Sequence, residues 1–171
     1  MTSTSLIKAI KDTAFLEGDF TTRAGKKTNY YIDKYLFETQ PDILNQLTDN
    51  IAELIKDLDY DLIAAPAFGA VPISAVLAKK TNDQFIIIKH QSNDDPLILG
   101  HYSAGQKVII IEDILTSGKT SLETAQYLSS IGLNVVTVVS VVNREEGGVE
   151  ALTEHGFDTV SMMTSSDLKN A

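Results

Sequence analysis

The sequence predicts an α/β fold with an open, mainly parallel, twisted sheet flanked by helices. Short apolar runs, typical of strands buried on both faces, alternate along the chain with longer segments whose apolar residues recur at helical spacing. That alternation indicates parallel strands joined by right-handed crossovers. The clearest strand is the aliphatic run 108–111, which is followed at once by Glu112 and Asp113, where a buried strand is expected to leave the core.

The first third of the chain predicts a small N-terminal hood and one long helix. Apolar residues between 6 and 15 fall at helical spacing, and Gly18 ends that helix. The aromatic-rich segment 28–37 has the composition of a strand. After Pro41, apolar residues up to position 58 mark one face of a long helix.

The rest of the chain alternates between strands and helices. Further strands are expected at 62–65, 85–89, 135–142 and 158–163, and helices at 71–80, from 119 to a stop at 132, and up to about 155. No linker divides the sequence, so residues 1–171 are expected to form a single domain. Ligands of such sheets bind at the carboxyl ends of the strands, where Phe68, Asp113 and Arg144 fall.

Composition excludes several classes of function. The net charge of −9 argues against non-specific binding to nucleic acid or to an anionic membrane. The absence of cysteine excludes disulfides, a thiolate nucleophile and zinc–thiolate sites. No apolar run reaches the roughly 20 residues that span a bilayer, and the first residues lack the positive charge of a signal peptide. A cytoplasmic location is the expectation.

The segment that follows the central strand carries the strongest chemical signal. Its hydroxyls and flexible glycine precede a helix, and backbone N–H groups at a helix start form a site for phosphate. The residues are Thr116, Ser117, Gly118, Lys119 and Thr120. Carboxylates beside a phosphate suit ribose hydroxyls or a metal ion, so the unit indicates a phosphorylated sugar. The alternative is a polar turn with an ordinary helix cap. A Walker A loop is excluded because Asp113 occupies the position where that motif requires a glycine.

This segment resembles the phosphoribosyl diphosphate (PRPP) motif of type I phosphoribosyltransferases, in which an acidic pair follows a hydrophobic strand and precedes a Thr-Ser-Gly-x-Thr loop. The resemblance implies that Glu112 and Asp113 lie by the ribose hydroxyls. It also implies that residues 116–120 hold the 5′-phosphate.

Residues 22–33 resemble the N-terminal signature of orotate phosphoribosyltransferases, with Gly25, Thr28 and Asp33 among the matching positions. Three cations and two aromatic residues surround the glycine turn and could hold a flat anionic ring. The resemblance places Arg23, Tyr30 and Tyr31 near the substrates. The alternative is a solvated basic turn before an edge strand.

Residues 143–148 resemble the same family's Asp-Arg-x-x-Gly-Gly segment, with Asn143 in place of aspartate. The resemblance implies that Arg144 meets the carboxylate of orotate, for which a guanidinium fork is well shaped. The alternative is a surface ion pair.

Two further loops resemble the part of the family that holds the diphosphate. Residues 65–73, with Phe68 and Gly69, match the diphosphate loop, although Ala65 replaces a glycine. In the segment 85–100, Lys89 is the one cation of the catalytic loop that is retained, with His90 as a second candidate donor. Asp94 and Asp95 would repel a diphosphate.

The implied reaction is displacement of diphosphate from C1 of PRPP by a ring nitrogen of orotate. The resemblance also implies Mg²⁺ bound through the diphosphate, with no side chain assigned as its ligand, and a homodimer. The atypical loop leaves two alternatives open. One is a phosphoribosyltransferase for another base, and the other is a non-catalytic PRPP or nucleotide sensor.

Overall fold

The computed structural model describes residues 2–21, 25, 27–92 and 95–171. Its helices and strands are, in chain order, α1 (Thr4–Ala14), β1 (Phe15–Thr21), β2 (Lys27–Ile32), α2 (Lys34–Glu38), α3 (Pro41–Ile55), β3 (Leu62–Pro66), α4 (Ala70–Thr81), β4 (Gln84–Lys89), β5 (Leu97–Leu99), β6 (Lys107–Leu115), α5 (Lys119–Ser130), β7 (Asn134–Asn143), α6 (Gly148–Glu154), β8 (Thr159–Thr164) and α7 (Ser165–Asn170).

The central sheet has six strands in the order β5-β4-β3-β6-β7-β8. Strand β5 is antiparallel to β4, and all other neighbours are parallel, which confirms the predicted α/β class. From β3 the chain first moves outward to β4 and later returns to β6 on the other side of β3. The order therefore reverses between β3 and β6. Open α/β sheets bind ligands at such a switch point, outside the carboxyl ends of the strands.

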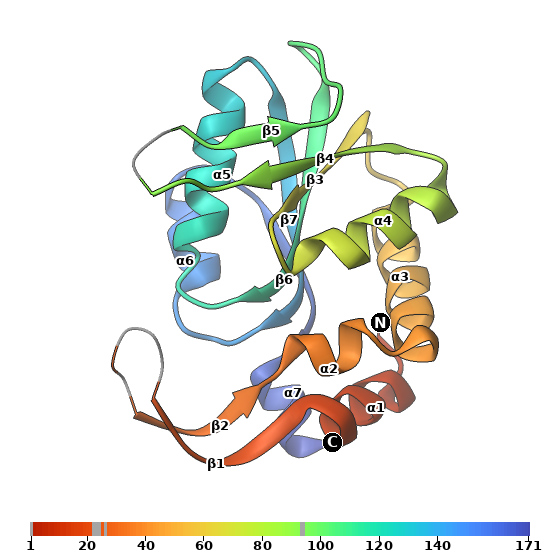
Figure 1. The fold of residues 1–171 in the computed structure, drawn as a ribbon, viewed down its shortest axis with the longest axis vertical. Helices are drawn as coiled ribbons and strands as arrows, with labels where there is room; N and C mark the ends of the chain where they lie inside the picture. Colours follow the sequence, from red (N-terminus) through yellow and green to blue (C-terminus); the bar gives the residue numbers. More distant parts are fainter. Residues whose placement is uncertain (1, 22–24, 26, 93–94) are drawn as a thin grey trace.

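Both faces of the sheet are covered by helices, and strand β6 is buried on both (Figure 1). Because successive side chains of a strand point to opposite faces, Ile109 and Ile111 join a core with α1, α3 and α4. Val108 and Ile110 join the second core with α5 and α6. The four aliphatic residues are completely buried, as the sequence predicts.

The hood lies beyond the carboxyl ends of β6 and β7 and contains both chain termini (Figure 1). It consists of the antiparallel pair β1–β2, α1, α2 and the C-terminal helix α7. Thr2 Oγ1 donates a hydrogen bond to the carbonyl of Met162 at 2.8 Å, and Lys11 Nζ donates to the carbonyl of Ala171 at 2.6 Å. The two ends of the sequence thus build one layer.

Several element predictions for the hood are wrong. The strand predicted at 28–37 ends at Ile32, because the Asp33 side chain accepts a hydrogen bond from the Tyr35 N–H at 3.1 Å and begins α2. Helix α1 ends at Ala14, and the adjoining residue starts β1, where it pairs with Ile32. Gly18 therefore lies inside a strand instead of ending a helix.

Two short elements were not predicted. Strand β5 has three residues, and α7 has six. Among the residues that the structure describes, no helix is both long and apolar enough to cross a bilayer.

Candidate active site

The acidic pair lies inside the last part of β6 instead of after the strand, so both side chains are almost buried. They point to opposite faces of the sheet. Glu112 Oε2 accepts a hydrogen bond from Ser121 Oγ of α5 at 2.6 Å. Asp113 Oδ1 accepts from the Ile114 N–H at 2.5 Å, and its Oδ2 pairs with Lys34 of α2. The two carboxyls therefore have different hydrogen-bond partners, although they lie close enough for Asp113 to affect Glu112.

The surroundings of Glu112 favour its neutral form. Burial, reinforced by the nearby charge of Asp113, raises the pKa of Glu112 to about 8, although the hydrogen bond from Ser121 opposes this shift. Near neutral pH the pair consequently holds less than its full two negative charges. A site with this charge repels an incoming anionic sugar less than two ionised carboxylates would.

The predicted phosphate loop forms the turn between β6 and α5. Gly118 adopts a left-handed backbone conformation with φ of 75°, and Ser117, Lys119 and Thr120 are exposed. No side chain caps the start of α5. The first backbone N–H groups of a helix have no partner within the helix. Together with the positive end of the helix dipole they form a site for a phosphate.

The loop after β3 meets the acidic pair. Phe68 is 73% exposed, and its peptide bond with Ala67 is cis. Gly69 contacts the end of β6 so closely that an added methyl group would collide with the Asp113 carboxylate and with Lys34. The structure thus brings together the candidate diphosphate loop and the candidate ribose-binding carboxylate.

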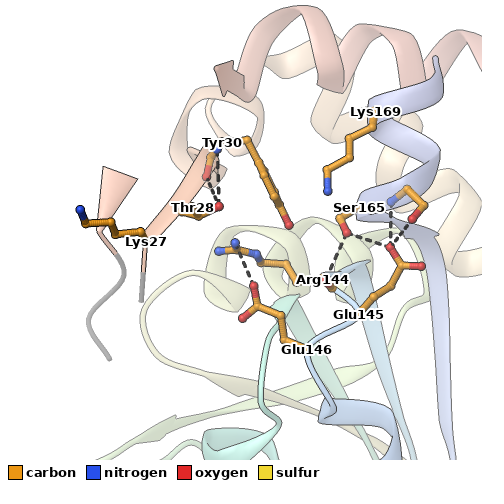
Figure 2. Close-up of a pocket in the computed structure, with 9 residues that line it drawn as sticks. Lys27, Thr28, Tyr30, Arg144, Glu145, Glu146, Ser165 and Lys169 are labelled. Atoms are coloured by element: carbon orange, nitrogen blue, oxygen red, sulfur yellow. Dashed lines mark hydrogen bonds and ion pairs between the residues drawn. The ribbon is translucent and has the colours of Figure 1, made fainter. Parts of the chain in front are cut away.

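Arg144 follows β7 and lies against the hood (Figure 2). Its guanidinium carbon is 4.9 Å from the centre of the Tyr30 ring, and its Nη2 is 3.0 Å from Glu146. Lys169 Nζ is 4.2 Å from the same ring centre, so two cations approach Tyr30 (Figure 2). Phe15 stacks on Tyr30 with the ring centres 5.1 Å apart.

A cavity of about 370 Å³ lies around Arg144 and Tyr30. Its lining is formed by Lys27, Thr28, Tyr30, Arg144, Glu145, Glu146, Ser165, Ser166 and Lys169. The lining includes neither the acidic pair nor the phosphate loop, so this cavity is distinct from the region around those two segments.

Glu145 fastens the arginine loop to α7. Its backbone has a φ of 59°, and its carboxylate accepts hydrogen bonds from Ser165 Oγ at 2.8 Å, from the Ser166 N–H at 2.9 Å and from Ser166 Oγ at 2.6 Å. The hydrogen bonds from the two serines lower the pKa of Glu145. The C-terminal helix therefore helps to position the loop that carries Arg144.

The remaining predicted residues lie apart from these contacts or outside the described residues. Tyr31 points away from Tyr30, is 44% exposed and approaches Phe20 at 5.7 Å. Lys89 ends β4, which is separated from β6 by β3, but it adjoins the loop after β3, whose Ala67 N–H donates to the Ile88 carbonyl at 2.8 Å. Arg23 lies outside the described residues. His90 Nε2 is 2.8 Å from Thr124 Oγ1 of α5.

Sequence reasoning missed Lys34, Glu38 and the residues of α7. Glu38 is 1% exposed, and neither oxygen of its carboxyl has a hydrogen-bond partner among the described residues. Burial and the charge of Asp113 raise the pKa of Glu38 to about 8. A capping box of Thr164 and Asp167 starts α7 and was a readable signal for that helix.

Comparison with known proteins defines the class. Residues 37–157 match the phosphoribosyl transferase domain family, and the fold described above is that of a phosphoribosyltransferase domain. The orotate phosphoribosyltransferase of Natronomonas pharaonis is 36% identical over 172 residues, covering 98% of each chain. The chain belongs to the orotate phosphoribosyltransferase family.

Solved structures agree with this assignment. The UMP synthase of Leishmania donovani matches 98% of this chain with a TM-score of 0.87 and 30% identity, although the match covers 37% of that longer chain. Orotate phosphoribosyltransferase from Aeropyrum pernix has the same fold, with a TM-score of 0.89, 24% identity and 96% coverage of both chains.

Proposed function

We propose that this protein transfers the 5-phosphoribosyl group from PRPP to orotate, giving orotidine 5′-phosphate and diphosphate. The observation that carries the proposal is the order of groups along two adjacent strands. The acidic pair lies in the last part of β6, and the phosphate loop follows that strand. Arg144 follows the neighbouring strand β7. A phosphorylated sugar and a carboxylate-bearing base therefore have adjoining places at one edge of the sheet.

The phosphate loop binds the 5′-phosphate of PRPP. Backbone N–H groups at the start of α5 donate to the phosphate oxygens, and the hydroxyls of Thr116, Ser117 and Thr120 add further donors. Gly118 allows the loop to turn so closely that the phosphate meets backbone instead of side chains.

The acidic pair lies by the ribose hydroxyls. Asp113, which faces the loop of Gly69, accepts hydrogen bonds from the sugar on the side of the diphosphate. A carboxylate in this place also stabilises the positive charge that develops on the ribose as the bond from C1 to the diphosphate breaks. The diphosphate leaves with the bonding electrons, the ring nitrogen of orotate forms the new bond to C1, and the proton of that nitrogen is released to water.

Arg144 selects the base. Its guanidinium lies against the Tyr30 ring, which limits its freedom before the ligand arrives. The carboxylate of orotate takes the place opposite this fork, in an environment that Lys27 and Lys169 make more positive. A base without a carboxylate lacks this contact.

Mg²⁺ fits the acidic pair as a metal that arrives with PRPP. Among the described residues, no three His, Cys, Asp or Glu side chains gather into a metal site. Protein-bound Mg²⁺ is commonly held by one or two carboxylates together with substrate phosphates and water, and Asp113 supplies such a carboxylate. When bound, Mg²⁺ supplies positive charge that stabilises the departing diphosphate.

Three broader statements belong to the same proposal. Residues 1–171 act as one domain, the location is cytoplasmic, and the assembly is a homodimer. The alternating elements, the net charge of −9 and the family resemblance support these statements. Light scattering on the purified protein tests the homodimer, and a mass of one chain would contradict it.

A second candidate function is PRPP binding without transfer to orotate. It is favoured by the loop between β4 and β5, in which Lys89 is followed by the exposed acidic residue Asp95. A panel of orotate, uracil and purine bases, each with PRPP and Mg²⁺, separates the candidates. Consumption of orotate supports the first function. Consumption of another base alone, or PRPP binding with no base consumed, contradicts it.

A further inference from the structure

We propose that Lys34 is a further substrate-binding residue, whose ammonium group contacts the diphosphate of PRPP. This inference rests on the proposed function and assigns a cation to its leaving group. Lys34 is the first residue of α2, and Asp33 caps that helix through its side chain. The helix carries Lys34 from the hood to the carboxyl ends of β3 and β6.

The position of the ammonium group is fixed by two contacts. Lys34 Nζ pairs with Asp113 Oδ2, and it lies so close to Gly69 that a Cβ added there would collide with it. The group therefore sits between the loop after β3 and the end of β6. These two segments are the candidate diphosphate loop and the candidate ribose-binding carboxylate, so the ammonium lies at the junction that the diphosphate of PRPP must occupy.

The ammonium group can also take a ligand. The Lys34 side chain is 28% exposed, whereas that of Asp113 is 5% exposed, so Lys34 forms the outer partner of the pair. An ammonium group has three N–H donors, and the described contacts use one of them, to Asp113. Phosphate oxygens can accept from the others without breaking the ion pair.

The other described cations near the candidate site have different surroundings. Lys119 lies at the phosphate loop, with its side chain 79% exposed. Arg144 and Lys169 flank Tyr30. Lys89 ends β4, beyond β3. Among the residues that the structure describes, Lys34 is the cation in contact with both Asp113 and Gly69.

The charges of the groups around Lys34 also favour the binding of an anion. Glu38, one turn further along α2, is buried and raised in pKa, which keeps its carboxyl neutral below about pH 8. Asp113 is then the main negative partner of Lys34. Lys34 neutralises the charge of Asp113 before PRPP binds. Its ammonium group contacts the diphosphate once PRPP is bound.

The test compares two halves of the substrate by isothermal titration calorimetry. Lys34→Met is expected to weaken binding of Mg²⁺-diphosphate about tenfold or more, while ribose 5-phosphate binds within about twofold of the wild-type affinity. Lys34→Arg keeps the charge and is expected to retain most of the diphosphate affinity. Lys107→Met is the matched control, because Lys107 pairs with Asp59 on an exposed surface. It should leave the affinity for both ligands unchanged.

Three outcomes overturn the proposal. Unchanged Mg²⁺-diphosphate affinity in Lys34→Met, or no diphosphate binding by the wild type, means that Lys34 does not contact the leaving group. Equal weakening of both ligands means that Lys34 merely holds Asp113 in place.

If Lys34→Met does not fold, a double variant keeps the test decisive. Lys34→Met combined with Asp113→Asn also removes the buried Asp113 carboxylate that would otherwise lose its cation. It should bind Mg²⁺-diphosphate more weakly than Asp113→Asn alone, and equal affinities overturn the proposal. Since no base enters these titrations, failure to consume orotate would contradict the proposed function without affecting this result.

Discussion

Gly118 and Gly148 lie backbone against backbone. A methyl group added to Gly118 would lie 2.8 Å from the Gly148 carbonyl oxygen. A methyl group added to Gly148 would lie 2.5 Å from the Thr116 carbonyl oxygen and 3.0 Å from the Gly118 nitrogen. The phosphate loop after β6 and the arginine loop after β7 are thus joined at this contact, which sets the distance between the two ends of the candidate site.

Gly148→Ala should weaken binding of ribose 5-phosphate by about tenfold or more, because displacement of a binding loop by even 1 Å is costly. The Thr116 carbonyl is backbone and cannot move without moving the loop. Calorimetric titration with ribose 5-phosphate measures the effect. Gly147→Asn is the matched control, since a methyl group there meets nothing within 4 Å and asparagine is among the side chains that adopt a left-handed φ, here 91°, most readily. Wild-type affinity in Gly148→Ala would show that this contact does not control the phosphate site.

Arg144→Ala should raise the KM for orotate roughly tenfold or more while changing the KM for PRPP much less. A charge-assisted contact with a carboxylate is commonly worth about 1.5–3 kcal/mol. Steady-state kinetics with each substrate varied in turn measure the difference. Uracil, which has no carboxylate, should be almost indifferent to the substitution if it reacts at all. Equal effects on orotate and uracil would mean that Arg144 only supports its loop.

Glu145→Gln should loosen the arginine loop, because the neutral amide accepts the three hydrogen bonds from Ser165 and Ser166 less strongly than a carboxylate does. The KM for orotate should rise severalfold and that for PRPP little. In the wild type, the lowered pKa of Glu145 adds stability above the ordinary carboxyl pKa, and this contribution is lost as the pH falls. The difference in melting temperature between the wild type and Glu145→Gln should therefore become smaller as the pH falls from neutral to acidic. A difference in melting temperature between variant and wild type that does not change with pH would contradict this role.

Glu38→Gln should flatten the pH dependence of stability. The pKa of Glu38 rises from 4.5 to about 8 on folding, so between these values the folded protein binds more protons than the unfolded chain. The free energy of unfolding of the wild type must then fall as the pH rises through this window. Glutamine cannot ionise and should remove that part of the slope, on the order of 1 kcal/mol or more by pH 8.

Urea unfolding at pH 5, 6.5 and 8 measures the slope for Glu38→Gln and for the wild type. Part of the slope should persist in the variant, because Glu112 shifts in the same direction. Lys34, Asp33 and Asp113 also face Glu38, so Asp33→Asn is a useful control that changes a neighbouring charge. Identical slopes in the wild type and in Glu38→Gln would show that Glu38 is already ionised in the folded protein.

The sheet was predictable because its strands carry strong local signals. Residues 108–111 are aliphatic without interruption, and burial on both faces requires that composition. The phosphate loop was equally readable, since hydroxyls and a glycine precede the amphipathic α5. The hood was not. Tyr35 and Phe37 favour a strand by composition, but the Asp33 cap turns the chain into α2.

The spatial arrangement of the candidate site was predictable only where its residues are neighbours in the sequence. Lys34 reaches Asp113 across 79 positions, and Lys169 reaches Tyr30 from the opposite end of the chain. Such contacts depend on how the hood folds over the sheet, which no local pattern encodes. The separation of Tyr30 from Tyr31 follows from strand alternation, but it requires knowing which face of β2 is buried.

The most direct measurement of the central claim is product identification after incubation of the purified protein with orotate, PRPP and Mg²⁺. The account predicts orotidine 5′-phosphate and diphosphate in equal amounts by chromatography with mass spectrometry, and a sharp loss of product in Arg144→Ala. Intact orotate beside bound but unconsumed PRPP, or a nucleotide formed from another base alone, would contradict it.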